Sequence, residues 1–272
     1  MRPVIMVDYG GKMPELQEHL CELLKRCQKE SPSFEHLRVM VIEDMIYLIH
    51  VKGLAEYVSS SLSSEAELHF VDLEQDPPKM ITLKEKSSVG MQLISVQKLF
   101  SLVFPLNGMT DEIRLPNRTD HTIEATSSNI TISPQSTEVV DLSSCICDSQ
   151  SCLSCDKFLR SEHGLSKRWL LGYPVVYLFD KEHIADAIYN LSTQSLRIFK
   201  ILVTRNGPFS KGSMPEELMS FSVPYELSME GSNEPWAEMF LAKMQSKWAK
   251  CKPTWRTLQM EVSECFPQAI AL

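Results

Sequence analysis

The stretch Trp169-Leu-Leu-Gly-Tyr-Pro-Val-Val-Tyr-Leu-Phe-Asp180 is the longest apolar run of the chain, and the charged residues Arg168 and Lys181 flank it. A run of β-branched and aromatic residues between charged ends is typical of a buried strand, because only its middle loses contact with water. Pro174 suits the first residue of such a strand, since proline has no amide proton to donate. We therefore expect residues 174–179 to form a central strand of the fold.

Helices and strands alternate in the first half of the chain, whereas strands cluster in the second half. The spacing of apolar residues predicts helices near 14–30, 54–62, 89–104 and 235–248. It predicts strands near 4–7, 37–42, 45–51, 68–73, 174–179, 196–203, 219–223 and 258–262. This order indicates an α/β fold, with a mixed α+β arrangement as the alternative, in which a mixed sheet is flanked by helices. The helix at 89–104 is apolar nearly all round, so we expect it to be largely buried.

The length of 272 residues fits a single α/β domain that spans residues 1–272. Between residues 107 and 150 the composition changes, and threonine, serine, asparagine and aspartate dominate. This segment holds too few apolar groups to offset the entropy lost on ordering. We expect it to form a long polar surface excursion, which is the one internal boundary that the sequence suggests.

Composition and charge exclude several function classes. No apolar run approaches the roughly 20 residues that span a bilayer, so no membrane insertion is expected. The net charge of −8 disfavours nucleic acid as a general partner, because phosphate backbones repel an acidic protein. The chain reaches Asp8 too soon for a secretory leader, and we expect a soluble protein of the cytoplasm, with the nucleus left open. In a reducing compartment its eight cysteines are thiols or metal ligands rather than disulfides, and the sequons at Asn117, Asn129 and Asn190 stay unmodified.

Four of these cysteines lie within eleven residues, at Cys145, Cys147, Cys152 and Cys155. Zinc prefers four soft ligands at tetrahedral corners, and a loop of closely spaced cysteines can supply them. The Cys-x-Cys-x4-Cys portion resembles the zinc-binding tail that follows SET methyltransferase domains, although nothing else in the chain resembles such an enzyme. Free thiols in a polar loop are the alternative, and a redox pair formed by Cys152 and Cys155 is another. A bound zinc ion is the one cofactor that the sequence suggests.

Acidic residues close three of the expected strands, at Asp8, Asp72 and Asp180. If these strands were parallel neighbours, the three carboxylates could converge to bind Mg²⁺ or to act as a base. Acids also end strands simply because strands end at water. The histidines at 163 and 183 flank the central run, where either could pair with Cys155 or Asp180 as a nucleophile and base.

A stripe of large apolar residues follows one face of the last expected helix, at Trp236, Met239, Phe240, Met244 and Trp248. Such a stripe can form a groove for a partner protein. It more often packs against the core, which is the interpretation that we favour.

Four short strings resemble an uncharacterised animal family of unknown function, the one typified by the chromosome-1 open-reading-frame-74 protein. They are Leu170–Tyr177 (LLGYPVVY), Ser195–Phe199 (SLRIF), Ser220–Pro224 (SFSVP) and Pro267–Leu272 (PQAIAL). The likeness covers about the last hundred residues well, and the first half only in general layout. It implies no activity, cofactor or catalytic residue.

Two hypotheses about function follow. The first is a protein that acts through contacts with a protein partner, or structurally, with a structural metal in its cysteine loop. The second is an enzyme with a carboxylate-based, metal-assisted hydrolase or transferase site at the strand ends. Convergence of Asp8, Asp72 and Asp180 around a pocket would favour the enzyme, and their separation would favour the interaction protein.

Overall fold

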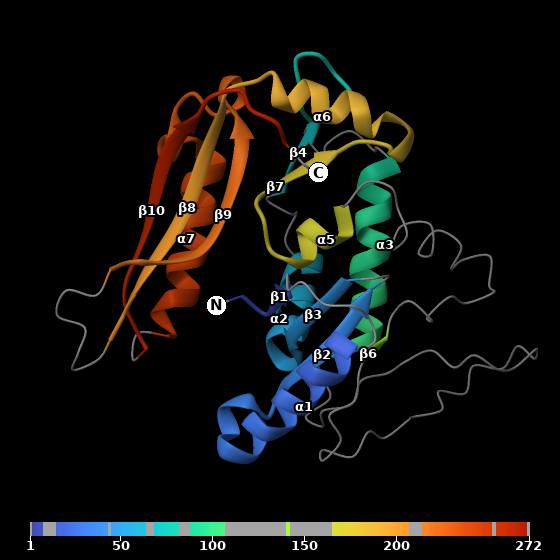
Figure 1. Cartoon of the computed structure of the whole chain (residues 1–272), viewed down its shortest axis with the longest axis vertical. Helices are drawn as coiled ribbons and strands as arrows, with labels where there is room; N and C mark the ends of the chain where they lie inside the picture. Colours follow the sequence, from blue (N-terminus) through green and yellow to red (C-terminus); the bar gives the residue numbers. More distant parts are fainter. Residues whose placement is uncertain are drawn as a thin grey trace, which may run out of the picture.

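The computed structural model describes residues 2–7, 15–42, 45–63, 68–81, 88–106, 140–141, 165–206, 214–251 and 254–270. Helices and strands are mixed along these segments, which confirms the predicted α/β class (Figure 1). The helices are α1 (Glu15–Glu30), α2 (Val51–Ser63), α3 (Ser88–Val103), α5 (Leu165–Leu170), α6 (Ile184–Ser192) and α7 (Pro235–Ala249). The strands are β1 (Val4–Met6), β2 (Leu37–Ile42), β3 (Met45–His50), β4 (His69–Asp72), β5 (Lys79–Ile81), β6 (Val140–Asp141), β7 (Val175–Leu178), β8 (Leu196–Arg205), β9 (Glu216–Pro224) and β10 (Trp255–Cys265).

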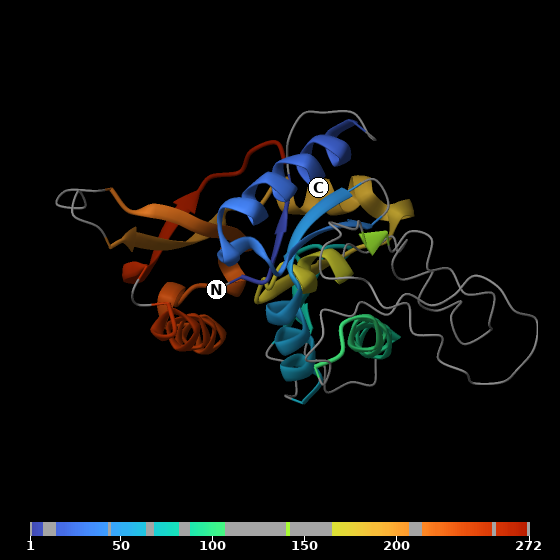
Figure 2. The ribbon, with the colours of Figure 1, turned by 90° about the horizontal axis from the view of Figure 1, so that it is seen from below.

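The first sheet has the strand order β1-β3-β2-β6 and is built around the antiparallel pair of β2 and β3, both predicted as strands. Successive side chains of a strand point to opposite faces, so β2 contributes to two cores. Val39 packs with Leu24 of α1 on one face, whereas Met40 and Ile42 join the larger core that includes α2 and α3. Figure 2 shows α1 on one side of this sheet and α2 and α3 on the other.

Strand β7 lies between two hydrophobic cores, which explains its uninterrupted apolar sequence. Val176 and Leu178 pack in the core shared with α2 and α3. Val175 and Tyr177 pack in the core shared with α6, β8 and α7. A strand buried on both faces needs apolar residues at every position. Its sheet has the order β5-β4-β7, with β4 and β7 parallel, so β7 is central in packing but lies at the edge of its sheet.

The third sheet, β10-β8-β9, is antiparallel, and α7 covers one of its faces (Figures 1 and 2). Phe199 of β8 stacks on Phe221 of β9 with ring centroids 5.3 Å apart. Trp236 of α7 stands edge-on to Phe199 at 5.0 Å, and Phe240 stands edge-on to Phe221 at 5.6 Å. Met244 is also buried. Core packing is therefore confirmed for Trp236, Phe240 and Met244, whereas Met239 of the same predicted stripe is exposed.

Three features differ from the sequence-based expectations. The strands form three small sheets within the described segments rather than one mixed sheet, because β8, β9 and β10 pair with one another while β7 pairs with β4. Helix α6 and strand β5 were not predicted. Helix α3 is only half buried, since side chains along its outer face remain exposed.

The organisation of residues 1–272 as one domain stays a prediction. Of the polar excursion at 107–150, the structure describes only β6, which pairs parallel to β2 through Met40 and Val140. Among the helices of the described segments, none combines the length and the apolar character needed to cross a membrane.

Candidate functional site

Two of the three predicted carboxylates lie at neighbouring strand ends. Asp72 is the last residue of β4, and Asp180 follows β7 by two residues. The two strands are parallel and hydrogen-bonded, with Asp72 opposite Leu178. Their carboxyl ends therefore meet at one edge of the sheet, as the sequence suggested for a parallel pair. Strand β1, which precedes Asp8, belongs to a different sheet and pairs antiparallel to β3, and Asp8 itself lies outside the described residues.

The oxygens of these carboxylates already accept backbone hydrogen bonds. Asp72 Oδ1 accepts the amide of Glu74 at 2.9 Å, and Asp180 Oδ1 accepts the amide of Glu182 at 3.3 Å. Glu74 ties the two turns together, because its Oε1 accepts the amide of Asp180 at 2.7 Å. Aspartate side chains that accept the amide two residues ahead stabilise turns. The arrangement therefore accounts for these acids as turn-forming groups at the end of the sheet.

The histidine at this edge pairs with a residue that the sequence did not suggest. His183 Nδ1 lies 3.4 Å from Glu74 Oε2, and the His183 backbone amide donates to the carbonyl of Asp180. Over the parts of the chain that the structure describes, no group of three or more His, Cys, Asp or Glu side chains could hold a metal ion. The predicted zinc ligands Cys145, Cys147, Cys152 and Cys155 and the histidine at 163 lie outside those parts.

The outer face of α3 carries exposed large apolar side chains. Met91, Ile94 and Leu102 have exposed fractions of 64%, 47% and 69%. Leu106, just beyond the helix, is also exposed. The inner face is buried against α2 and α5, with Phe100 edge-on to Trp169 at 5.6 Å. Sequence periodicity found this helix but could not reveal which of its apolar faces stays open.

A groove lies beside this face, between α2 and α3. Its volume is about 350 Å³. The lining is mostly apolar, and it consists of Ala55, Ser59, Leu62, Ser101, Phe104 and Leu106. Ligand-binding pockets begin at about this size and have mostly apolar walls.

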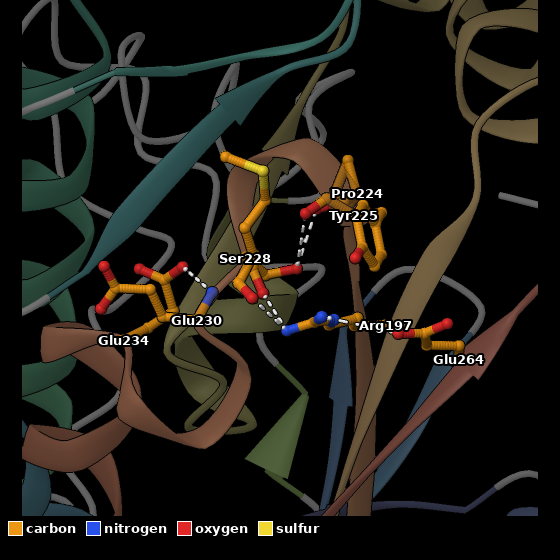
Figure 3. Close-up of polar contacts among 8 residues, drawn as sticks. Arg197, Pro224, Tyr225, Ser228, Glu230, Glu234 and Glu264 are labelled. Atoms are coloured by element: carbon orange, nitrogen blue, oxygen red, sulfur yellow. Dashed lines mark hydrogen bonds and ion pairs between the residues drawn. The ribbon is translucent and has the colours of Figure 1, made fainter.

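A second polar cluster surrounds Arg197 of β8 and was not foreseen (Figure 3). Its Nη1 donates to the carbonyls of Ser228 and Met229, both at 2.7 Å, and its guanidinium lies 4.6 Å from the ring centroid of Tyr225. Glu264 of β10 adds a contact at 3.5 Å. Only 13% of the Arg197 side chain is exposed. Because Nη1 donates to two backbone carbonyls, Arg197 ties β8 to the turn that leads into α7.

The asparagine of one of the three glycosylation sequons has a structural role inside the fold. Asn190 of α6 is buried, and its Nδ2 donates to the carbonyl of Leu73 at 2.9 Å and to that of Gln75 at 3.4 Å. Because this amide is engaged inside the fold, Asn190 is inaccessible to a glycosyltransferase in the folded chain.

Comparison with known proteins gives one match. Neither a curated protein nor a solved structure matches the chain significantly. A family model described as "Domain of unknown function (DUF4504)" matches residues 1–272. The chain therefore belongs, over its whole length, to this family of domains of unknown function.

Proposed function

We propose that the protein acts through protein contacts, and that it binds an apolar helical segment of a partner protein along the outer face of α3. The observation that carries this proposal is the exposure of Met91, Ile94 and Leu102 on one helix. Several large apolar side chains exposed on one face of a helix often mark an interaction site. Burial of each such side chain contributes about 1.5–3 kcal/mol.

The spacing of the residues fits a helical partner. Ile94, Lys98 and Leu102 follow one another at intervals of four, so they form one stripe along α3. A helix that packs against such a stripe uses anchors at three- and four-residue intervals. The groove between α2 and α3 extends the apolar surface next to Leu106 and provides space for an anchoring side chain.

Lys98 adds a requirement on the charge of the partner. It is exposed between Ile94 and Leu102. A partner helix that buries these two apolar residues brings one of its own positions close to the Lys98 ammonium. We therefore expect an amphipathic partner helix whose apolar anchors flank an aspartate or glutamate, because complementary charge fixes register and specificity.

Site-specific photo-crosslinking in cells tests the proposal. A photoreactive residue at position 102 should form a discrete adduct with a second protein, and the same residue at Gln245, an exposed position of α7, should not. Adding Ile94→Glu should abolish the adduct, because a carboxylate would lose its water on burial. Only intrachain adducts would show that the chain's own segments cover α3, and only adducts between two copies would show self-association. Either result, or the absence of a site-specific adduct, would contradict the proposal.

A charge swap then tests the partner's chemistry. For the crosslinked segment of an identified partner, Lys98→Glu should weaken binding by about tenfold, and replacing the partner's acid with lysine should restore it. Failure of the reciprocal change to restore binding would contradict the predicted pairing.

The enzyme hypothesis has weaker support. The adjacency of Asp72 and Asp180 favours a carboxylate-based, metal-assisted hydrolase or transferase. Their engagement in turn hydrogen bonds leaves fewer free oxygens for a metal or a substrate. Unchanged activity of an Asp180→Asn variant toward phosphatase and esterase substrates, or no activity in the parent, would count against it.

We also infer that the family is the animal family typified by the chromosome-1 open-reading-frame-74 protein, on the strength of the four strings quoted above. We propose the cytoplasm as its compartment and no nucleic-acid partner, as the net charge of −8 suggests. The four cysteines in the described segments, Cys21, Cys27, Cys251 and Cys265, are free thiols, which supports a reducing compartment.

A further inference from the structure

A small pocket lies between α7, α2 and residues 169–173. The two helices cross here, since Figure 2 shows α7 end-on and α2 along its length. The volume of the pocket is about 50 Å³. Four aromatic rings, one methionine and two lysines form most of its wall: Tyr57, Trp169, Tyr173, Phe240, Met244, Lys243 and Lys247. The pocket is independent of the α3 face on which the proposed function rests.

The two lysines place positive charge on this pocket without a countercharge. Lys243 and Lys247 are four residues apart on α7, so they share one face of the helix. The Lys247 Nζ lies 5.3 Å from the ring centroid of Tyr57. Within the described part of the chain, neither ammonium group has a carboxylate partner or a hydrogen-bond acceptor. Burial, reinforced by the charges of Lys243 and Lys250, lowers the pKa of Lys247.

A third cation, Arg2, lies against Tyr173 of the wall and donates to the carbonyls of Leu218 and Leu171. The Arg2 guanidinium lies 5.4 Å from the ring centroid of Tyr173. The Tyr57 hydroxyl donates its proton to the carbonyl of Trp169. The Nε1 of Trp169 is buried and has no hydrogen-bond partner within the described segments. The lining thus contains two ammonium groups and no carboxylate.

We propose that this pocket binds the phosphate group of a small ligand. Lysines bind phosphate as point charges, and the partial burial of Lys247 strengthens its attraction for an anion. A cavity needs about 10–15 Å³ to hold one water-sized group, so the pocket has room for about three to five such groups. A phosphate group presents four oxygens, and the rest of its ligand would lie outside the pocket.

The position of Lys247 in the last turn of α7 does not by itself explain its burial. The C-terminal end of a helix stabilises positive charge, and it does so for exposed lysines such as Lys250 as well. Removing an ammonium group from water has a cost, and the Tyr57 ring offsets only part of it, since the pKa of Lys247 remains lowered. A bound anion supplies a compensating charge and would raise the pKa of Lys247 toward its ordinary value.

Calorimetric titration of the full-length chain with inorganic phosphate and with glycerol phosphate tests the proposal. Lys247→Met keeps the apolar stem and helix propensity but removes the charge, and it should weaken binding by about 10- to 100-fold. The matched control is Lys250→Met, which removes an exposed lysine outside the pocket wall and should change affinity by less than about threefold. Tighter binding of glycerol phosphate would identify a phosphate group on a larger ligand, and equal binding would identify free phosphate.

Two results would overturn the proposal. One is the absence of phosphate binding by the parent chain at millimolar concentration, and the other is equal loss in the two lysine variants. If the Lys247→Met variant fails to fold, the Lys243→Gln variant is titrated in its place, because Lys243 is the more exposed of the two lysines. NMR of the Lys247 ammonium gives a second readout, because phosphate should raise the pKa of Lys247 in the parent chain.

Discussion

The hydroxyl group of Tyr57 donates a 2.7 Å hydrogen bond to the backbone carbonyl of Trp169, although the two residues lie 112 positions apart in the chain. Their rings are also in contact, with centroids 5.6 Å apart. Both side chains are buried, and burial raises the pKa of Tyr57 because it disfavours the phenolate. The bond therefore joins α2 to the segment that leads into β7.

Replacing Tyr57 with phenylalanine tests this connection. The substitution keeps the ring but leaves the Trp169 carbonyl without its donor, so we expect the free energy of unfolding to fall by about 1–3 kcal/mol. Urea denaturation measures the change. Tyr189→Phe, at an exposed tyrosine of α6, is the control and should have little effect. Equal losses in both variants would show that the hydrogen bond contributes nothing specific.

Alanine substitutions at Gly231 and Gly172 separate the effect of crowding Arg197 from the effect of a positive φ angle. Both have positive φ angles, +61° and +76°, which β-carbon-bearing residues adopt at a cost of roughly 1–2 kcal/mol. A Cβ at Gly231 would lie 2.9 Å from Arg197 Nη1, whereas a Cβ at Gly172 would meet nothing within 4 Å. The guanidinium cannot easily move away, because Ser228 and Met229 hold it.

We therefore expect Gly231→Ala to lower the free energy of unfolding more than Gly172→Ala, by about 1 kcal/mol for the disturbed hydrogen bonds. The additional loss of stability in Gly231→Ala should become smaller when Arg197 is also replaced by lysine, because lysine lacks the crowded Nη1 atom. Urea titration of the four variants measures this coupling. An excess that persists in the double variant would show that Arg197 is not its cause.

The local elements of the fold were predictable because their evidence is local. Two short apolar runs identified strands β2 and β3, and helical spacing identified α1 and α7. The run at Val175–Leu178 is apolar at every position because its two faces enter two cores. Helix α6 was missed because its face toward the core is narrow, with Ala187, Asn190 and Leu191 as its buried residues.

The arrangement of elements and sites could not be predicted in the same way. The pairing of β4 with β7 joins segments about a hundred residues apart, and no local pattern specifies it. Whether the apolar outer face of α3 is covered depends on its neighbours and not on its own periodicity. Lys247 becomes part of a pocket only because α2 brings Tyr57 next to α7, so its spacing from Lys243 alone predicts a solvated face.

Replacing Asn190 tests how α6 is attached to the β5-β4-β7 sheet. Asn190→Asp removes the amide donor to Leu73 and Gln75 and places a carboxylate near two carbonyl oxygens, so we expect a loss of more than about 2 kcal/mol at pH 7. Asn233→Asp, at an exposed asparagine, is the control. The loss should decrease at acidic pH, where the new carboxyl group is protonated and can donate. A pH-independent loss would contradict this explanation.

The cysteine cluster predicts bound zinc. Protein purified without chelator should carry near-stoichiometric zinc if Cys145, Cys147, Cys152 and Cys155 form a structural site. The Cys152→Ser variant should lose most of the bound zinc, because zinc prefers thiolate to hydroxyl ligands. Cys21→Ser, at a half-buried thiol of α1, should keep it. Elemental analysis with thiol counting measures both, and a metal-free parent whose four cluster thiols react freely would rule out the site.

The side chain of His50 caps helix α2 and should make the stability of the protein depend on pH. Its Nδ1 accepts a 3.0 Å hydrogen bond from the amide of Gly53, and His50 directly precedes the first residue of α2. Burial, and next the charge of His36, lower the pKa of His50 from its ordinary value near 6.5. Protonation also removes the lone pair that accepts the Gly53 amide.

The sign of this dependence follows from proton binding. The unfolded chain binds the His50 proton more readily than the folded chain, so the contribution to stability is complete above about pH 6.5 and is lost as the pH falls through the lower folded pKa. His50→Asn keeps an acceptor at the cap and cannot titrate. We expect it to be within about 1 kcal/mol of the parent at pH 7.5 and to lose less stability between pH 7 and pH 5. Urea denaturation across this range measures the slope, with His19→Asn at an exposed histidine of α1 as the control. An unchanged slope in His50→Asn would assign the acid sensitivity to other groups, because this variant removes the titration while preserving the cap.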